Sequence, residues 1–229
     1  MGEAPHNKLV EIAVFDFDGT CISGNSPVIL VTSLMKQGLL GKGISLKIGF
    51  WGLAYKFRLP QNESWVRGAV FTAFEGKPRE EVDAFLRRFY NERLERIFRA
   101  QADAEIRKHR SQGREVWVVS ATFEPIVLEA MEHHGFTHEL STRMATDVHG
   151  CYTRNVEGLP VEGSQKLALL TQCANERYGV GGWVLTHAYG DHHSDRALLG
   201  AAQNAFAVCP DRPLRRTASE HGWKTLDWN

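Results

Sequence analysis

The sequence predicts an α/β fold in which a parallel sheet is interrupted by an inserted helical segment. Short apolar runs alternate with stretches of helical periodicity through the second half of the chain, a pattern typical of parallel sheets. A block with helical spacing alone separates the first apolar run, residues 10–15, from the next, residues 116–119. We therefore expect a core formed by residues 1–20 and 105–229, with residues 21–104 as an α-helical cap domain.

Each predicted strand is a short apolar run bounded by polar residues or turn formers. The runs are residues 10–15, residues 116–119, the stretch GGWVLTHAYGD and the stretch NAFAVCP. The stretch MATDVHGCYTRNVEG also predicts a β-hairpin, which turns at its HG pair.

The predicted helices begin and end at proline and glycine signals. Pro78 is followed by two glutamates, whose charges suit the N-terminal end of a helix. Gly113 is expected just beyond a helix C-terminus, where glycine readily takes the left-handed conformation. Pro125 begins the next helix, which ends near the following glycine. Residues 163–178 are predicted to form one more helix.

The charge balance argues against a protein that binds nucleic acid through its phosphates. The chain has 229 residues, of which 27 are Lys or Arg and 27 are Asp or Glu, so its formal net charge is zero. A bulk nucleic-acid binder shows a basic excess instead.

The cysteine pattern and the hydropathy predict a cytoplasmic protein. The four cysteines are scattered and form no C-x-x-C pair, which favours free thiols over a disulfide framework. The N-terminus has no charged-then-apolar signal pattern. Because no stretch of about 18 uncharged apolar residues occurs, we expect no transmembrane segment. The sequence leaves the oligomeric state open.

Two aspartates stand at the end of the first predicted strand, in the stretch AVFDFDGTC. Asp16 and Asp18 are two positions apart, where the apolar run gives way to Gly and Thr. As turn residues or a side-chain cap they would need no further partner. Two neighbouring carboxylates repel each other, however, and a bound cation removes that repulsion. The pair therefore favours a metal site over a simple turn.

Other polar residues are predicted at the same edge of the sheet. Ser120 ends the second apolar strand, Lys166 opens a helix, and Asp191 and Asp195 follow the run VLTHAYG. Ligands of open α/β sheets bind beyond the carboxyl ends of the strands, so these side chains are expected to converge. Taken singly, Ser120 also fits a helix N-cap and Lys166 a solvated lysine.

The chemistry of these residue types points to phosphoryl transfer. An oxygen-only set of carboxylates suits Mg²⁺ rather than zinc. A lysine and a serine supply the positive charge and the hydrogen-bond donors that a phosphoryl group needs. Asp16 can attack phosphorus as a nucleophile, and Asp18 can protonate the leaving oxygen and later deprotonate water. The sequence thus predicts a Mg²⁺-dependent phosphomonoesterase with a small phosphorylated substrate.

The motifs DFDGT, VVSAT, Lys166 and GDHHSD, in this order, resemble the four motifs of the haloacid dehalogenase (HAD) superfamily. The helical insertion after the first motif is similar to the cap of subfamily IB, the branch that contains phosphoserine phosphatase. The resemblance implies a Rossmann-like core, an aspartyl-phosphate intermediate and Mg²⁺ as the cofactor. It also implies these roles: Asp16 as the nucleophile, Asp18 as the general acid and base, Ser120, Ala121 and Lys166 as phosphate ligands, Asp16, the backbone carbonyl of Asp18 and Asp191 as metal ligands, and Asp195 as support for the metal site.

The position nine residues after the nucleophile bears on the substrate. The phosphoserine phosphatases that this chain resembles carry a glutamate there to hold the substrate's ammonium, whereas this chain has Asn25. Arg67 lies roughly where those enzymes place a carboxylate-binding arginine. Because a neutral Asn cannot supply the missing charge, we expect another small or lipid-like phosphate ester rather than phosphoserine.

Two alternatives stay open for the function. The cap stretch GLLGKGISLKIGFWGLAYKFRLP mixes apolar residues with Lys42, Lys47, Lys56 and Arg58. It would fit a peripheral membrane contact and a substrate of the phosphatidylglycerophosphate or lysophospholipid type, although packing between cap helices is the favoured interpretation. The other alternative is a non-catalytic binding protein that retains the fold. It is disfavoured because every catalytic position is present.

Three further residues invite a reactive role. His192 and His193 suggest a metal, but adjacent residues point different ways and no other His or Cys stands at ligand spacing, so we expect them to line the entrance loop. Cys21 has no evident His partner and is expected to be a packing thiol.

Overall fold

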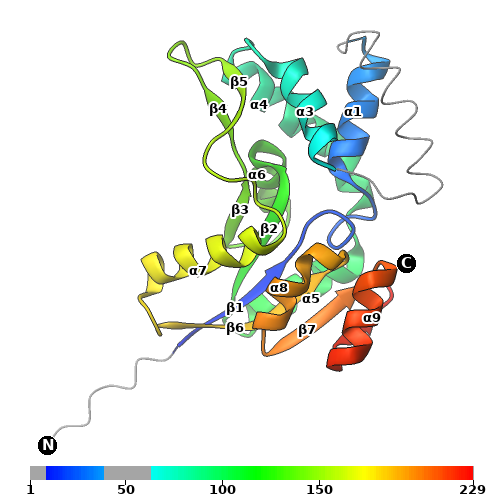
Figure 1. The fold of residues 1–229 in the computed structure, drawn as a ribbon, viewed down its shortest axis with the longest axis vertical. Coiled ribbons are helices and arrows are strands. Elements are labelled where there is room, and N and C mark those ends of the chain that lie inside the picture. The colour runs from blue at the N-terminus through cyan, green and yellow to red at the C-terminus, as the bar shows by residue number, and fades with distance from the viewer. Residues whose placement is uncertain (1–8, 39–62, 229) are drawn as a thin grey trace, which may run out of the picture.

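In the computed structural model, which describes residues 9–38 and 63–228, a six-stranded sheet lies between helices on both of its faces (Figure 1). Its strand order is β3-β2-β1-β6-β7-β8, and every neighbouring pair is parallel. The predicted parallel α/β sheet is therefore confirmed. The strands are β1 (Val10–Phe15), β2 (Glu115–Phe123), β3 (His138–Thr142), β6 (Trp183–Gly190), β7 (Asn204–Val208) and β8 (Lys224–Leu226).

The central strand β1 is apolar on both sides because both faces of the sheet are covered. Ala13 and Phe15 belong to the hydrophobic cluster on one face, whereas Ile12 and Val14 belong to the cluster on the other. This alternation follows the two-residue period of a strand. A continuous apolar run is therefore the expected signature of β1, and the strand begins and ends where that run predicts.

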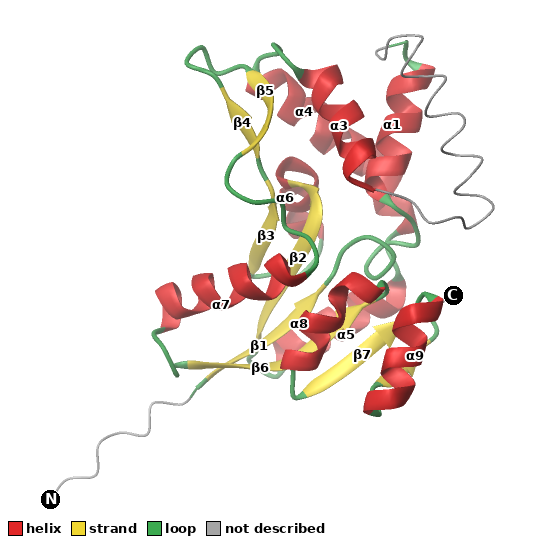
Figure 2. Ribbon diagram, in the orientation of Figure 1, coloured by secondary structure: helices red, strands yellow, loops and turns green. Residues whose placement is uncertain are grey.

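Helices on the two faces supply the other half of each cluster. Residues of α5 (Ala100–Ser111) and α6 (Glu124–His133) pack on the first face, and residues of α7 (Ser164–Tyr178), α8 (Arg196–Ala201) and α9 (Arg212–His221) pack on the second (Figure 2). The predicted helix signals are confirmed. Gly113 has a φ of 77° beyond the end of α5, and Pro125 lies in the first turn of α6.

A separate layer of helices lies beyond the carboxyl end of β1 (Figure 1). It contains α1 (Ser26–Lys36), α3 (Glu63–Phe74) and α4 (Arg79–Phe89), followed by the π-helix η1 (Tyr90–Leu94) and the 3-10 helix η2 (Glu95–Ile97). Pro78 occupies the N-cap of α4, as predicted. The predicted basic stretch with Lys42, Lys47, Lys56 and Arg58 lies outside the described residues.

The predicted hairpin is confirmed, and it packs against this helical layer. Its strands β4 (Met144–Thr146) and β5 (Tyr152–Val156) are antiparallel. Cys151 forms a β-bridge with Pro78, the Tyr152 hydroxyl donates to Asp83, and Arg154 forms an ion pair of 2.7 Å with Glu75. The division of the chain into a core (residues 1–20 and 105–229) and a cap (residues 21–104) stays a prediction. The boundary at residue 104 falls inside α5, and the hairpin, which belongs to the predicted core, contacts helices of the predicted cap.

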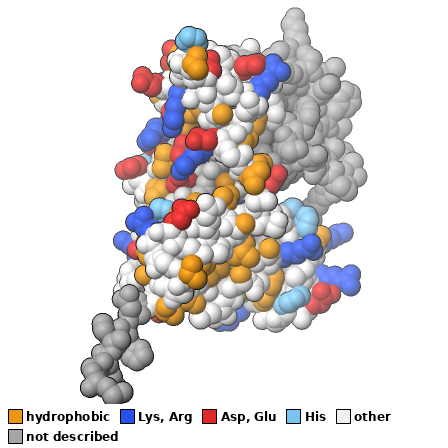
Figure 3. Space-filling model, turned by 60° about the vertical axis from the view of Figure 1, so that its left-hand side comes forward, with side chains coloured by type: hydrophobic (Ala, Val, Ile, Leu, Met, Phe, Trp, Pro, Cys, Tyr) orange, Lys and Arg blue, Asp and Glu red, His pale blue; other side chains and the backbone are white. Residues whose placement is uncertain are grey.

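The surface carries both signs of charge. On the face shown in Figure 3, acidic and basic side chains are interspersed around apolar ones, in keeping with the zero net charge of the chain. Within residues 9–38 and 63–228, no helix combines the length and the apolar character that crossing a bilayer requires.

Candidate active site

Three adjacent strands deliver the predicted acidic and hydroxyl residues to one region. Asp16 and Asp18 follow β1, Asp191 follows β6, and Ser120 lies on β2. Because these three strands are neighbours in the sheet, their carboxyl ends lie together. The Asp16 amide donates to the Tyr189 carbonyl at 2.9 Å, which continues the pairing of β1 with β6 to the first aspartate.

Lys166 lies between two of the predicted carboxylates. Its Nζ donates to Oδ1 of Asp16 and to Oδ1 of Asp195, each at 2.6 Å. All three side chains are buried, with Lys166 only 5% exposed. The lysine stands in the first turn of α7, after Gly163, whose φ of 54° a side chain would disfavour. The alternative of a solvated helix lysine is therefore wrong.

Burial and mutual repulsion shift the proton equilibria of this group. Burial raises the pKa of Asp16 to about 6, although the neighbouring Lys166 opposes the rise. Burial, together with the charges of Asp16 and Asp195, raises the pKa of Asp191 well above its ordinary value. Burial alone would lower the pKa of Lys166, but the same two carboxylates reverse this and raise it. One ammonium therefore offsets only part of the burial penalty and the mutual repulsion of these carboxylates.

The donor set fits a hard divalent cation. Asp16, Asp191 and Asp195 each offer a carboxylate oxygen, and these atoms all lie within 4.8 Å of one another. Oxygen donors of this kind suit Mg²⁺, which would also offset the repulsion that raises the pKa of Asp191. The expected contribution of the Asp18 backbone carbonyl stays a prediction.

Asp18 is held by a network that reaches the next strand. The Ser26 amide donates to Oδ1 of Asp18 at 2.5 Å, and the Ser26 hydroxyl donates to Oδ2 at 3.1 Å. The same hydroxyl lies 2.5 Å from the Thr122 hydroxyl on β2. Ser26 and Thr122 are both fully buried, so Thr122 fixes the Ser26 hydroxyl and Ser26 in turn orients the Asp18 carboxylate.

Ser120 and Ala121 lie inside β2 rather than at its end, which corrects the sequence-based assignment. The register between β2 and β3 shifts between Val119 and Phe123, so the regular ladder is interrupted where these two residues stand. The Ser120 hydroxyl accepts from the Thr122 amide at 3.1 Å and thereby stabilises a local turn of the backbone. The N-cap position of α6 is Phe123, so the alternative of Ser120 as a helix cap is wrong.

The loop after Asp18 approaches Asp191 closely. Gly19 has a φ of 73°, and a Cβ atom built on it would lie 2.0 Å from Oδ2 of Asp191. The Thr20 hydroxyl lies 3.5 Å from Oδ1 of the same aspartate. The glycine of the first motif is thus required by the space around Asp191, in addition to the turn geometry.

The two residues predicted for substrate selection are only partly described. Asn25 is the N-cap of α1, and its side-chain oxygen accepts from the Val28 amide at 3.1 Å. Arg67 belongs to α3, but its side chain lies outside the described residues. The assignment of both residues to the substrate stays a prediction.

Cys21, His192 and His193 are the other residues for which the sequence invites a reactive role. Cys21 is a packing thiol, as expected: it is fully buried, and burial together with the charges of Asp16 and Asp18 raises its pKa. The expectation that His192 and His193 point different ways is wrong. Both rings approach the same oxygen, Oδ2 of Asp211, at 3.4 and 3.5 Å.

Sequence reasoning missed Ser26 and Thr122, although both carry a weak signal. Ser26 follows an N-cap asparagine and precedes Pro27, the mark of a helix start. Thr122 stands two residues after Ser120 in the motif VVSAT. Neither pattern alone reveals that the two hydroxyls meet across 96 positions of sequence.

Comparison with known proteins adds family information to this geometry. The family described as haloacid dehalogenase-like hydrolase matches residues 13–200, which is most of the chain. The chain is 27% identical to a histidinol-phosphatase of Neisseria meningitidis over 231 residues, covering 95% of this chain and 98% of the relative.

Two solved structures share the fold at low sequence identity. A protein of unknown function from Bordetella pertussis superposes with a TM-score of 0.84 at 21% identity, covering 97% of this chain and all of the other. A substrate-bound phosphoserine phosphatase superposes with a TM-score of 0.65 at 20% identity, covering 96% and 93% of the two chains.

Proposed function

Because the chain belongs to the haloacid dehalogenase-like hydrolase family, we propose that it is a Mg²⁺-dependent phosphomonoesterase that acts through an aspartyl-phosphate intermediate. The observation that carries this proposal is the buried contact of Asp16 with Lys166 at the carboxyl end of β1. A carboxylate held by a cation at this place is suited to meet a phosphoryl group. The neighbouring acids supply oxygen atoms for metal binding and for proton transfer.

In the first half of the proposed reaction, Asp16 is the nucleophile. With a pKa of about 6, its carboxyl group is mostly ionised near neutral pH. A carboxylate oxygen of Asp16 attacks phosphorus, and the bond from phosphorus to the ester oxygen breaks. Asp18 donates a proton to that oxygen, so the alcohol leaves neutral. Lys166 and the backbone around Ser120 and Ala121 would bind the phosphoryl oxygens.

In the second half, Asp18 acts in the opposite direction. Its carboxylate takes a proton from water, and the resulting hydroxide attacks phosphorus. The bond between phosphorus and Asp16 breaks, which releases inorganic phosphate and restores the Asp16 carboxylate. Ser26, which itself contacts the Thr122 hydroxyl, would hold Asp18 in place through both steps.

Asp16, Asp191 and the backbone carbonyl of Asp18 are the groups that would hold Mg²⁺, and Asp195, whose carboxylate lies close to those of Asp16 and Asp191, would support the site. When bound, the cation supplies positive charge that polarises the phosphoryl group and offsets the charge developing on its oxygens. The chain's own contribution is to keep these oxygens close together despite their repulsion. Lys166 does this by donating to two of the three carboxylates.

For the substrate, we propose a small phosphate monoester without a requirement for an amino group. Asn25 carries no charge, and its side-chain oxygen already accepts from the Val28 amide. An ammonium placed there would gain little Coulomb energy. Histidinol phosphate and phosphoserine, which the names of two similar proteins suggest, are nevertheless the first compounds to compare.

The test is phosphate release from a panel of esters by the wild-type protein and by Asp16→Asn, with Mg²⁺ and with EDTA. The panel contains p-nitrophenyl phosphate, histidinol phosphate, phosphoserine and lysophosphatidic acid. We expect Mg²⁺-dependent release by the wild type and none by Asp16→Asn. Asp147→Asn, in the exposed turn of the hairpin, is the matched control and should retain full activity.

Two outcomes would contradict the proposal. Unchanged turnover by folded Asp16→Asn would remove the nucleophile from the mechanism. Activity that EDTA leaves intact would remove the metal. Release from lysophosphatidic acid alone would instead favour the lipid-like substrate class.

A further inference from the structure

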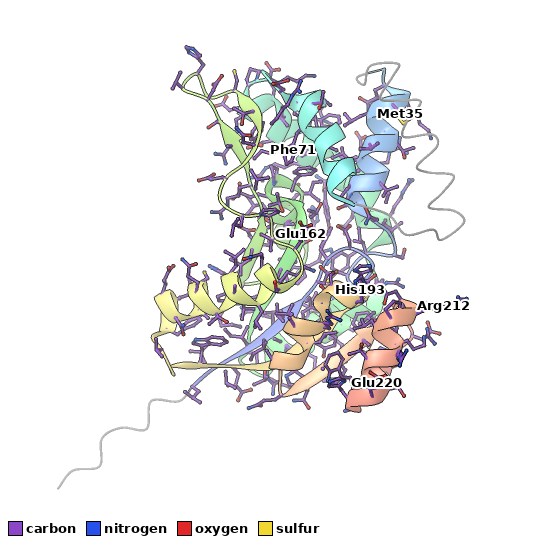
Figure 4. All side chains as sticks on the ribbon, viewed as in Figure 1. Met35, Phe71, Glu162, His193, Arg212 and Glu220 are labelled. Carbon is purple, nitrogen blue, oxygen red and sulfur yellow. The ribbon has the colours of Figure 1, made fainter. Side chains whose placement is uncertain are left out.

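A second group of side chains with metal-ligating atoms lies on the surface, between the loop after β6 and the start of α9. His192 and His193 stand in that loop, and Asp211 is the N-cap of α9. Figure 4 places His193 beside the first turn of α9, where Arg212 is labelled. Nε2 of His192 lies 3.4 Å from Oδ2 of Asp211, and Nδ1 of His193 lies 3.5 Å from the same oxygen.

These two nitrogen-to-oxygen distances are closer to the separation of two ligands on one metal ion than to the length of a hydrogen bond. An N–H···O hydrogen bond usually spans about 2.7–3.2 Å, less than either distance. Zinc takes nitrogen and oxygen ligands at about 2.0–2.2 Å, which places neighbouring ligands of a tetrahedral site about 3.4 Å apart. The three donor atoms also lie within 4.8 Å of one another. Two of the three donor pairs are therefore spaced as neighbouring ligands of one metal ion, and the third pair is close enough for both nitrogens to reach the same ion.

The surrounding contacts orient each ligand. Oδ1 of Asp211 accepts from the Leu214 amide at 2.7 Å, while Oδ2 accepts from the His193 amide at 3.3 Å and faces the two rings. Nδ1 of His192 lies 2.9 Å from the Ser194 hydroxyl. That hydroxyl can accept a hydrogen bond from a protonated Nδ1, which leaves the Nε2 lone pair for a metal. In this tautomer Nδ1 no longer accepts from the Ser194 amide, a weaker contact of 3.3 Å.

We propose that His192, His193 and Asp211 bind a divalent transition metal ion of the zinc class, at a site distinct from the Mg²⁺ carboxylates. Imidazole nitrogens are borderline donors, so a set of two imidazoles and one carboxylate suits Zn²⁺, Ni²⁺ or Cu²⁺ rather than Mg²⁺. His192 and His193 are 45% and 49% exposed, so water can complete the coordination. The exposed Arg212 adds a nearby positive charge, which water screens.

The bound ion would join two segments that already support the active-site loop. The Asp211 amide donates to the Asp191 carbonyl at 2.9 Å, and the His192 amide donates to Oδ2 of Asp195 at 3.3 Å. A metal on the three side chains cross-links this loop to α9. The expected consequence is a rise in the melting temperature, because the ion binds the folded chain and not the unfolded one. This inference does not depend on the proposed phosphatase activity.

The test is Zn²⁺ binding to the full chain, measured by competition with a chromophoric chelator in excess Mg²⁺, which occupies the carboxylate site. We expect one tight Zn²⁺ per chain and a higher melting temperature. His193→Ala removes one ligand and should weaken binding at least about tenfold. His221→Ala, which removes an exposed histidine from the far end of α9, is the matched control and should bind Zn²⁺ as the wild type does.

A second pair of variants separates the two metal sites. Asp211→Asn can still cap α9 through its side-chain oxygen, so it should fold normally yet bind Zn²⁺ more weakly. Asp16→Asn should retain the wild-type affinity for Zn²⁺. Equal Zn²⁺ affinity in His193→Ala, Asp211→Asn and the wild type would overturn the proposal. So would a loss of tight binding in Asp16→Asn, since it would place the ion among the carboxylates.

Discussion

Lys166 donates a hydrogen bond of 2.6 Å from Nζ to Oδ1 of Asp16, although the two residues stand 150 positions apart in the sequence. The same ammonium also contacts Asp195 at 2.6 Å. Lys166 is therefore the buried cation that balances the charges of both Asp16 and Asp195. Its removal should change the stability and the activity of the protein.

Lys166→Met should destabilise the protein and abolish phosphate release. The substitution leaves buried carboxylates without their cation, and breaking a buried ion pair from one side typically costs about 3–5 kcal/mol. Unfolding in denaturant, followed by circular dichroism, measures the change. Arg216→Met is the control, because its pair with Glu220 is exposed and should contribute less than about 1 kcal/mol. Equal stability of the two variants would contradict this account of Lys166.

The stability of the metal-free protein should depend on the protonation of Asp16. The pKa of this carboxyl group is raised from 3.8 to about 6, so between these values the folded state holds a proton that the unfolded chain has lost. The free energy of unfolding therefore falls as the pH rises through this window, by up to about 1.4 kcal/mol per pH unit. Added Mg²⁺ should remove the decline by favouring the ionised form.

Comparison with Asp16→Asn, which keeps a neutral side chain at every pH, tests the contribution of Asp16 together with that of Asp191, whose pKa the Asp16 charge helps to raise. Relative to the wild type in EDTA, the variant should gain stability between about pH 4 and about pH 6. His109 acts in the opposite sense, because burial lowers its pKa to about 4, but its contribution is common to both proteins and cancels in the difference. A difference that stays constant with pH would show that Asp16 does not titrate in this range.

Ser26→Ala should lower kcat by about tenfold with a smaller effect on KM. The substitution removes the hydroxyl that donates to Asp18 and leaves the Thr122 hydroxyl without this partner, a loss of about 1–1.5 kcal/mol. Ser26→Thr, which keeps a hydroxyl, should recover part of kcat. Ser33→Ala, on the same helix, is the control. If Ser26→Ala changed the melting temperature alone, the serine would have only a structural role.

Gly19→Ala should lose Mg²⁺-dependent activity because the new methyl group would collide with the Asp191 carboxylate, 2.0 Å away. Gly158→Ala is the matched control: its φ of 75° is similar, but nothing lies within 4 Å of the added Cβ. Both variants should lose about 1 kcal/mol of stability through backbone strain. Only Gly19→Ala should require more Mg²⁺ for half-maximal phosphate release. The same requirement in both variants would exclude the collision as the cause.

The buried elements of this fold could be predicted from the sequence because their residues face apolar surroundings on both sides. The strand β1 begins and ends with its apolar run, and the residues at its carboxyl end fall among the carboxylates as expected. The edge strands β3 and β8 were not predicted. The first has the polar sequence HELST and the second only three residues, so neither produces an apolar run.

The side-chain contacts that complete the site depend on backbone detail that residue spacing does not encode. Ser120 was placed at a strand end because the apolar run stops there, yet β2 continues to Phe123 through a shift of register. His192 and His193 were expected to diverge as neighbours do in a regular element. The backbone instead changes from extended at His192 to a 3-10 helix at His193, which turns both rings to Asp211.

The packing of the β4–β5 hairpin on α3 and α4 limits how the helical layer can move relative to the sheet. The chain crosses between sheet and layer before α1 and after η2, and again on either side of the hairpin. A rigid-body displacement of the layer must preserve all of these crossings. The Asp83–Tyr152 and Glu75–Arg154 contacts join the hairpin to the helices, so a displacement of the layer has to carry the hairpin with it.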